Sequence, residues 1–211
     1  MSPKEEDTFW VFGQEYAQIS NDSVQVAVAF DRAYRDYIAF DVEITNLSQN
    51  TFLVSPEKFY YLPQHSLGDS VAYAPVHAIN PESKLLEIDK KLSKGEANYA
   101  SAVAVDATLS LLDVFLEIAT DEEGASNAEL ERDISRVERE QNHTRRVTNL
   151  NTLREEWEME TIRKTSLNPN HQIQGKGYFP ITLWAKYVHL HLPLNNYLFD
   201  FVFTQKIHSA H

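Results

Sequence analysis

The chain has 211 residues, a net charge of −12 and no cysteine. The central segment 81–165 holds 19 of the 31 acidic and 12 of the 19 basic residues, so this segment and the remainder are both acidic. Binding to nucleic acid or to an anionic membrane surface is therefore disfavoured, because each requires a basic surface. Disulfides, thiolate metal sites and a cysteine nucleophile are excluded.

Alternation of apolar and polar residues predicts strands in the first eighty residues. Val24, Val26 and Val28 share one face of a strand, and the turn at Arg35 and Asp36 leads into a second one. Turn residues separate the shorter strands that follow. The strands expected in this part are 9–12, 24–34, 37–46, 52–54, 59–62 and 71–76.

Residues 81–165 instead have the composition and the three-to-four spacing of helices. Asn80 followed by Pro81 is typical of a helix start, and Gly95 predicts a kink or a break in the first helix. A turn over 120–125 and a capping box from Ser126 predict a return helix, which we expect to end at 167–169. The expected apolar stripe of the return helix is Leu130, Ile134, Val137, Gln141, Val147, Leu150, Leu153 and Trp157.

The strand pattern returns at 172–179, 187–192 and 197–204. Neither β stretch has enough strands to bury both faces of a sheet by itself. We therefore predict a mainly β protein, an antiparallel β-sandwich interrupted by a long antiparallel helical hairpin. The sandwich takes its strands from 1–80 and 166–211, and the hairpin occupies 81–165.

Two motifs support this fold. The first motif has the order strand, Asn, small polar turn, strand and aromatic. Its residues are FDVEITN at 40–46, Ser48, and FLVSPEKF at 52–59. The stretch 165–179 has the form of a late hairpin, with Asn170 where Gly is usual. These β portions resemble the immunoglobulin-like domains of bacterial exported proteins and lipoproteins of unknown function. The resemblance implies an immunoglobulin-like fold and the cell envelope, and it transfers no catalytic residue.

The segment 97–119 is apolar over most of a helical circumference, which is typical of a helix covered on more than one side. Asp106, Asp113 and Glu117 form a thin polar stripe, and three charges argue against a membrane span.

An antiparallel hairpin with its turn near Glu123 predicts ion pairs between the limbs. Asp113 is expected opposite Arg132 and Arg136, and Asp106 opposite Arg139.

The wide apolar face has two interpretations. It packs on the sheet of its own domain, or a second subunit or another protein covers it. For the second interpretation, the predicted partner-binding anchors are Leu109, Leu112, Phe115 and Leu116.

His189 and His191 have the spacing of a metal site, because residues two apart on a strand share a face. A third ligand would come from His171, His77 or a carboxylate. The alternative is a pair of surface histidines that alternate with buried Val188, Leu190 and Leu192.

No catalytic motif is present, so we expect a non-enzymatic interaction or structural protein of the bacterial envelope, without a cofactor. Its hairpin would bind a second copy or a protein partner. The alternative is a ligand-binding module for metal or carbohydrate. Candidate sugar-stacking aromatics are Trp10, Tyr16, Tyr60, Tyr61, Tyr178, Trp184 and Tyr187. The first ten residues contain no apolar signal segment, which predicts a cytoplasmic protein if Met1 is the native start.

Overall fold

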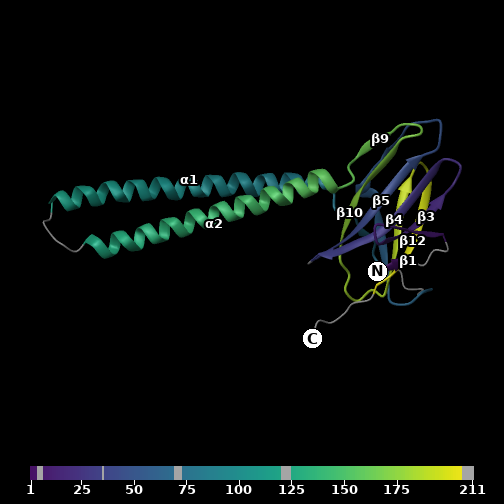
Figure 1. The fold of residues 1–211 in the computed structure, drawn as a ribbon, viewed down its shortest axis with the longest axis horizontal. Helices are drawn as coiled ribbons and strands as arrows, with labels where there is room; N and C mark the ends of the chain where they lie inside the picture. The colour runs from purple at the N-terminus through teal and green to yellow at the C-terminus, as the bar shows by residue number, and fades with distance from the viewer. Residues whose placement is uncertain (4–6, 35, 69–72, 120–124, 206–211) are drawn as a thin grey trace. The chain divides into compact units, whose positions relative to one another are not determined.

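The computed structural model describes residues 1–3, 7–34, 36–68, 73–119 and 125–205, and for 34, 105–119 and 125–134 it describes the backbone alone. The chain divides into two compact units. We call Met1–Lys84 with Glu158–His211 the β unit, and Leu85–Trp157 the helical unit. Figure 1 draws the strands of the first and the two long helices of the second.

The β unit contains two five-stranded antiparallel sheets. Sheet A has the order β1 (Ser2–Pro3), β12 (Tyr197–Thr204), β11 (Tyr187–Leu194), β7 (Tyr60–Gln64), β8 (Val76–His77). Sheet B has the order β10 (Gln172–Pro180), β5 (Tyr37–Asn46), β4 (Val24–Tyr34), β3 (Gln14–Ser20), β2 (Thr8–Val11). A small third sheet pairs β6 (Phe52–Val54) with β9 (Thr165–Leu167), and a short 3-10 helix covers Pro56–Lys58.

The inner faces of both sheets bury one common core. Phe40 of sheet B lies 4.8 Å from Phe203 of sheet A, measured between ring centroids, and Tyr61 lies 5.9 Å from Phe179. These side chains belong to alternate strand positions, as a sheet with one buried face requires. Burial of each such aromatic stabilises the fold by about 2–3 kcal/mol.

Strands from before and after the helices pair directly, which confirms a β-rich fold with a helical insertion. β5 pairs with β10, β7 with β11 and β6 with β9, so each pair joins the two parts of the β unit. The chain also re-enters this unit beside β10, where Thr161 forms a parallel bridge with Lys176.

The two helices are α1 (Pro81–Ala119) and α2 (Ala125–Glu160). α1 starts where the sequence predicts, because Asn80 Oδ1 accepts hydrogen bonds from the backbone N–H groups of Glu82 (3.0 Å) and Ser83 (3.3 Å). Over their described residues, neither helix combines the length and apolar character needed to cross a membrane.

Several predicted element boundaries are wrong. α1 continues through Gly95 without the expected break, because a single glycine costs a long helix only about 1 kcal/mol. α2 ends at Glu160 rather than at 167–169, and 165–167 form β9. β1 and β3 are strands that the sequence did not predict. The expected strand 71–76 falls partly outside the described residues, and only Val76–His77 forms β8.

Candidate functional site

Within the helical unit, described side chains of α1 and α2 are in direct contact. The rings of Tyr99 and His143 stack with centroids 4.0 Å apart, and Arg154 Nε donates to Asp89 Oδ1 at 2.9 Å. The residue numbers rise along one helix as they fall along the other, as antiparallel helices require.

The less exposed residues of the described helical unit follow a heptad-like spacing, and together we call them the seam. On α1 these residues, apart from the ion-paired Asp89, are Leu85, Ile88, Leu92, Gly95, Tyr99 and Ala102. On α2, apart from Arg154, they are His143, Val147, Leu150, Leu153 and Trp157. Alternating steps of four and three place such residues on one helix face.

The seam on α2 stops at His143 over the described residues. All of residues 135–142 are exposed, and Val137 keeps 51% of its surface in solvent. Val103 on α1 is 44% exposed. Val137 and Gln141 of the predicted apolar stripe are therefore exposed, and the side chains of Leu130 and Ile134 lie outside the described residues.

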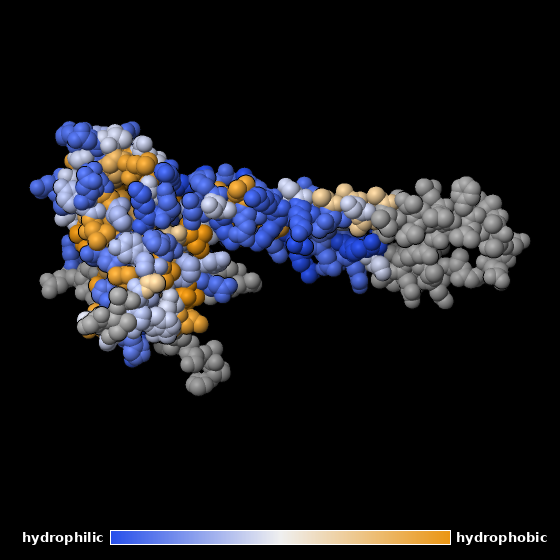
Figure 2. All heavy atoms as spheres, turned by 180° about the vertical axis from the view of Figure 1, so that it is seen from behind, coloured by the Kyte–Doolittle hydropathy of each residue, from blue (hydrophilic) through white to orange (hydrophobic). Residues whose placement is uncertain are grey.

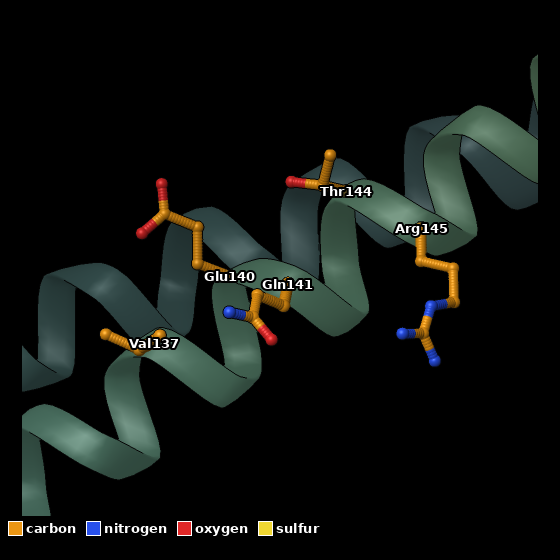
Figure 3. Close-up of a pocket in the computed structure, with 5 residues that line it drawn as sticks. All are labelled: Val137, Glu140, Gln141, Thr144 and Arg145. Atoms are coloured by element: carbon orange, nitrogen blue, oxygen red, sulfur yellow. The ribbon is translucent and has the colours of Figure 1, made fainter.

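A groove of about 590 Å³ lies along this part of α2. It is lined by Val137, Glu140, Gln141, Thr144 and Arg145, all of which are exposed. Figure 3 shows these five side chains on successive turns of α2. Their spacing of i, i+3, i+4, i+7 and i+8 marks one continuous helix stripe. This shape fits a neighbouring helix better than an enclosed small molecule, because ligand sites bury most of the ligand.

The predicted anchors Leu109, Leu112, Phe115 and Leu116 lie outside the residues whose side chains are described. The same holds for Asp106, Asp113 and Arg132, so the predicted inter-limb ion pairs remain predictions. Figure 2 shows a mainly hydrophilic surface over the described parts of the helices and larger apolar patches on the β unit.

His189 and His191 lie on β11 and share the face turned away from the core. Val188, Leu190 and Leu192 alternate with them and are buried, as the sequence predicts for surface histidines. The strand therefore brings the two imidazoles to one side of sheet A.

Sheet register then places His191 in a cross-strand row with three other polar side chains. Tyr60 lies on one side, Asp200 on the other, and His77 follows Tyr60. The His191 and Tyr60 rings stack with centroids 4.8 Å apart. His191 Nδ1 donates a hydrogen bond to Asp200 Oδ1. The ring is therefore fixed, and its buried Nε2 has no hydrogen-bond partner in the described chain.

The row lacks a complete ligand set. Over the described residues, no three His, Asp or Glu side chains lie together as a metal would require. Tyr60 separates His77 from His191, and His171 lies in a turn beside sheet B, where its Nδ1 contacts the Pro169 carbonyl. Metal binding by His189 and His191 remains a prediction.

Charged side chains on the outer face of sheet B form a network that the sequence did not predict. Lys176 Nζ lies 2.7 Å from Glu160 Oε2 and 3.2 Å from Asp31 Oδ2. Arg32 contacts the same two carboxylates, each at 3.1 Å. Asp41 sits directly opposite Lys176 in the register. The sequence shows only that Asp31, Asp41 and Lys176 are charged residues within predicted strands, and cross-strand pairing decides which of them meet.

Burial and charge shift several pKa values in this network. Burial raises the pKa of Asp41, and the nearby Asp31 raises it further, while Gln14 and Lys176 partly oppose the shift. Burial by itself lowers the pKa of Lys176, but its hydrogen bonds to Glu160 and Asp31 outweigh it and raise the pKa. Burial also raises the pKa of Tyr16. Shifted pKa values mark candidate sites, although structural ion networks produce them too.

The arrangement of the network is better suited to holding strands together than to acid–base chemistry. Asp31 and Glu160 each contact both cations, so their charges are balanced locally. A general acid or base instead needs room for a substrate within hydrogen-bond reach. The network joins β4, β10 and Glu160, where the chain re-enters the β unit.

The candidate aromatic platform is not assembled. Tyr61 is buried in the core and contacts the Pro180 carbonyl at 2.7 Å through its hydroxyl. Tyr60 is adjacent on β7 and points to the opposite face of sheet A, whereas Tyr16 lies on sheet B. The prediction that all of these aromatic residues form one stacking surface is therefore wrong.

Apolar side chains also line a groove of about 530 Å³ in the β unit. Leu53, Tyr197 and Leu198 are among its exposed lining residues.

Comparison of the chain with protein-family models, with curated proteins and with solved structures finds no match.

Proposed function

We propose that this chain is a non-enzymatic interaction or structural protein whose helical unit binds a second copy of the chain or another protein. In this proposal the helices form one antiparallel hairpin, and the β unit is an immunoglobulin-like sandwich that carries it. The motif resemblance favours a role in the bacterial envelope.

The main support is the point at which the seam ends. Pairing of the two helices partly covers side chains as far as Ala102 on α1 and His143 on α2, while Val103 and Val137 beyond them stay exposed. A two-helix pair covers only one stripe of each helix, so Val103 and Val137 are accessible to a further helix.

The sequence of α1 extends this argument toward the predicted anchors. Continued past Ala102, the seam spacing assigns Leu109 and Leu116 to the stripe that faces α2. Leu112 and Phe115 fall off that stripe and have no place in a two-helix pair. We therefore assign these two residues to the outer contact and the other two to the pairing of the helices.

This assignment predicts different results for two matched double variants. Leu112→Gln with Phe115→Gln should weaken self-association by removing the helical contact, and should leave the unfolding midpoint of the helical unit unchanged. Leu109→Gln with Leu116→Gln should lower that midpoint. Glutamine is a good helix former, so both variants keep the helical propensity of α1.

Sedimentation velocity of the full chain over a dilution series measures the first effect, and urea unfolding followed by far-ultraviolet circular dichroism measures the second. A wild-type chain that remains monomeric at every concentration removes the self-association form of the proposal. An outer-contact variant that associates as tightly as wild type overturns the assignment of the two anchors.

A ligand-binding function is the second candidate, and the row around His191 favours it. Asp200 orients the imidazole, and a buried Nε2 is the atom that a metal or a polar ligand would contact. Calorimetric titration of the full chain with zinc tests it. His191→Ala should remove the binding heat, whereas His171→Ala should preserve it. Absence of heat in the wild type rejects zinc binding.

A further inference from the structure

Three of the four edges of the five-stranded sheets carry features that discourage pairing with another strand. β1 contains Pro3, and β8 has only two residues. β10 carries Lys176, ends at Pro180 and is bridged by Thr161. Short strands, proline, lysine and a covering segment are the usual protections of sheet edges.

The fourth edge, β2, is longer than β1 and β8 at four residues, and over the described residues it carries none of the other protections. Its sequence TFWV contains neither proline nor charge, and it pairs with β3 without a register shift. Phe9, Trp10 and Val11 are all exposed, and Trp10 keeps 68% of its surface in solvent. An exposed apolar edge of this kind, here four residues long, is a site where another strand can add.

The turn that follows β2 adds a second apolar group. Phe12 and Gly13 both have positive φ, at 49° and 83°, and connect Val11 to Gln14. Such two-residue turns favour Asn-Gly, because a bulky side chain at positive φ is strained. Phe12 is also fully exposed, at 103%. Over the described residues of the β unit, Phe12 therefore has no packing role, and its side chain is accessible to another molecule.

Hydrogen-bond alternation identifies the backbone groups that face outward from β2. Gln18 N–H donates to the Asp7 carbonyl at 3.0 Å, so these two residues form a hydrogen-bonded pair. Because hydrogen-bonded and non-hydrogen-bonded pairs alternate, Thr8 and Trp10 occupy non-hydrogen-bonded positions opposite β3. Their N–H and C=O groups point away from the sheet and are available to another strand.

We infer that β2 pairs in antiparallel orientation with β2 of a second copy, about a two-fold axis at Phe9. Thr8 of each copy then lies opposite Trp10 of the other, and both residues exchange their outward backbone hydrogen bonds. The B sheets of the two copies join into one continuous sheet.

The side chains of β2 fit this symmetric register. Phe9 stacks on Tyr16 with ring centroids 5.4 Å apart, and pairing at the axis places the Phe9 side chains of both copies side by side in one aromatic row. Asp7 falls opposite Val11, so no like charges meet directly. A two-fold contact between identical chains requires a strand that can pair with itself. Because β2 meets this requirement, we assign a second copy of the chain as its partner.

This interface lies in the β unit and is independent of the contact proposed for the helices. The first test is Trp10→Pro in the full chain. Proline removes an outward N–H that β3 does not use, and proline is tolerated on edge strands for this reason. Self-association measured by sedimentation velocity should weaken by about tenfold or more. Near-ultraviolet circular dichroism should retain the wild-type signal of the aromatic core.

The second test changes Phe9, the residue at the proposed two-fold axis. Phe9→Lys and Phe9→Glu each place like charges opposite one another across the two-fold, so each variant alone should lose the β2 contact and associate more weakly than the wild type. An equimolar mixture of the two should associate again, because Lys then faces Glu. Recovery in the mixture also demonstrates that both variants are folded.

Trp10→Pro, Phe9→Lys and Phe9→Glu are each also introduced into the chain that carries Leu112→Gln and Phe115→Gln. This background lacks the helical contact, so any association that it retains reports on the β2 contact. Association that persists in this background and is lost on adding Trp10→Pro supports the β2 interface. The inference is overturned if this background is monomeric at every concentration, if Trp10→Pro leaves its association unchanged, or if the lysine and glutamate variants fail to associate when mixed.

Discussion

The side-chain amide of Asn46 donates a hydrogen bond to the backbone carbonyl of Leu167, 121 residues later, at an N–O distance of 2.9 Å. The same amide donates to the Asn50 carbonyl at 2.8 Å, and Asn46 is fully buried. One side chain at the end of β5 therefore binds both the turn that follows and β9, which lies beyond the helical insertion. The contact is part of what makes the two parts of the β unit a single body.

Asn46→Ala should lower the free energy of unfolding by about 2 kcal/mol, because the buried Leu167 carbonyl loses its donor and the partly exposed Asn50 carbonyl loses one of its own. Asn50→Ala is the matched control. Asn50 takes part through its backbone carbonyl and is exposed, so its replacement should cost under about 0.5 kcal/mol. Urea unfolding followed by tryptophan fluorescence measures both. Equal losses in the two variants would show that the buried hydrogen bonds contribute little.

Gly175 allows the chain to re-enter the β unit beside β10. A Cβ added there would lie 2.7 Å from the backbone nitrogen of Ile162 and 2.9 Å from its Cα. Gly175→Ala should therefore destabilise the protein by about 2 kcal/mol, because backbone atoms must move.

Gly177→Ala is the control for this position. Its Cβ would meet a ring carbon of Phe179 at 3.3 Å, and a side chain moves more easily than backbone, so the loss should stay below about 1 kcal/mol. Thermal unfolding compares the two variants. The role assigned to Gly175 fails if its alanine variant is as stable as that of Gly177.

Adjacent leucines on α1 provide a matched test of the seam. Leu85 is 8% exposed and Leu86 is 54% exposed. Leu85→Ala should cost about 2–4 kcal/mol through lost burial and a cavity, and Leu86→Ala should cost less than about 1 kcal/mol. Both changes remove the same atoms from neighbouring positions of one helix. Chemical unfolding followed by circular dichroism at helical wavelengths measures the difference, and similar costs would contradict the seam.

The sequence predicts the principal pairing of the β unit because its signals are local and strong. Strict alternation in 24–34 and 37–46 identifies β4 and β5, and the number of strands requires the two parts of the chain to combine. β3 was missed because its sequence QEYAQIS is mainly polar, and only pairing with β2 and β4 makes it a strand. The end of α2 was misplaced because helix-forming residues continue past Glu160, while β9 forms through its pairing with β6.

The candidate sites depend on information that the sequence does not contain. Spacing alone places His189 and His191 on one face, but the partnership of His191 with Asp200 and Tyr60 requires the register of three strands. The ion network on sheet B likewise joins Asp31 to Lys176, which no sequence spacing relates. The apolar edge at β2 was visible as residues 9–12, but its exposure follows from its position at the end of the sheet order.

The raised pKa of Asp41 leads to a prediction about pH. Burial is its largest cause, followed in the same direction by the charge of Asp31. A carboxyl group with a higher pKa in the folded than in the unfolded state binds its proton more tightly when folded. Its titration therefore destabilises the fold as the pH rises from the unfolded pKa through the folded one. Below the unfolded pKa both states are protonated, and this penalty is absent.

Asp41→Asn should therefore be more stable than the wild type at neutral pH. The difference between their free energies of unfolding should decrease as the pH falls through the acidic range, and should become constant once Asp41 is protonated in both the folded and the unfolded chain. Urea unfolding of both proteins at a series of pH values measures it, since every other titrating group is common to the two. Glu43→Gln, which changes the next outward carboxylate of β5, controls for the general effect of removing one negative charge. A stability difference between Asp41→Asn and wild type that does not vary with pH would show that Asp41 titrates alike in the folded and unfolded chains.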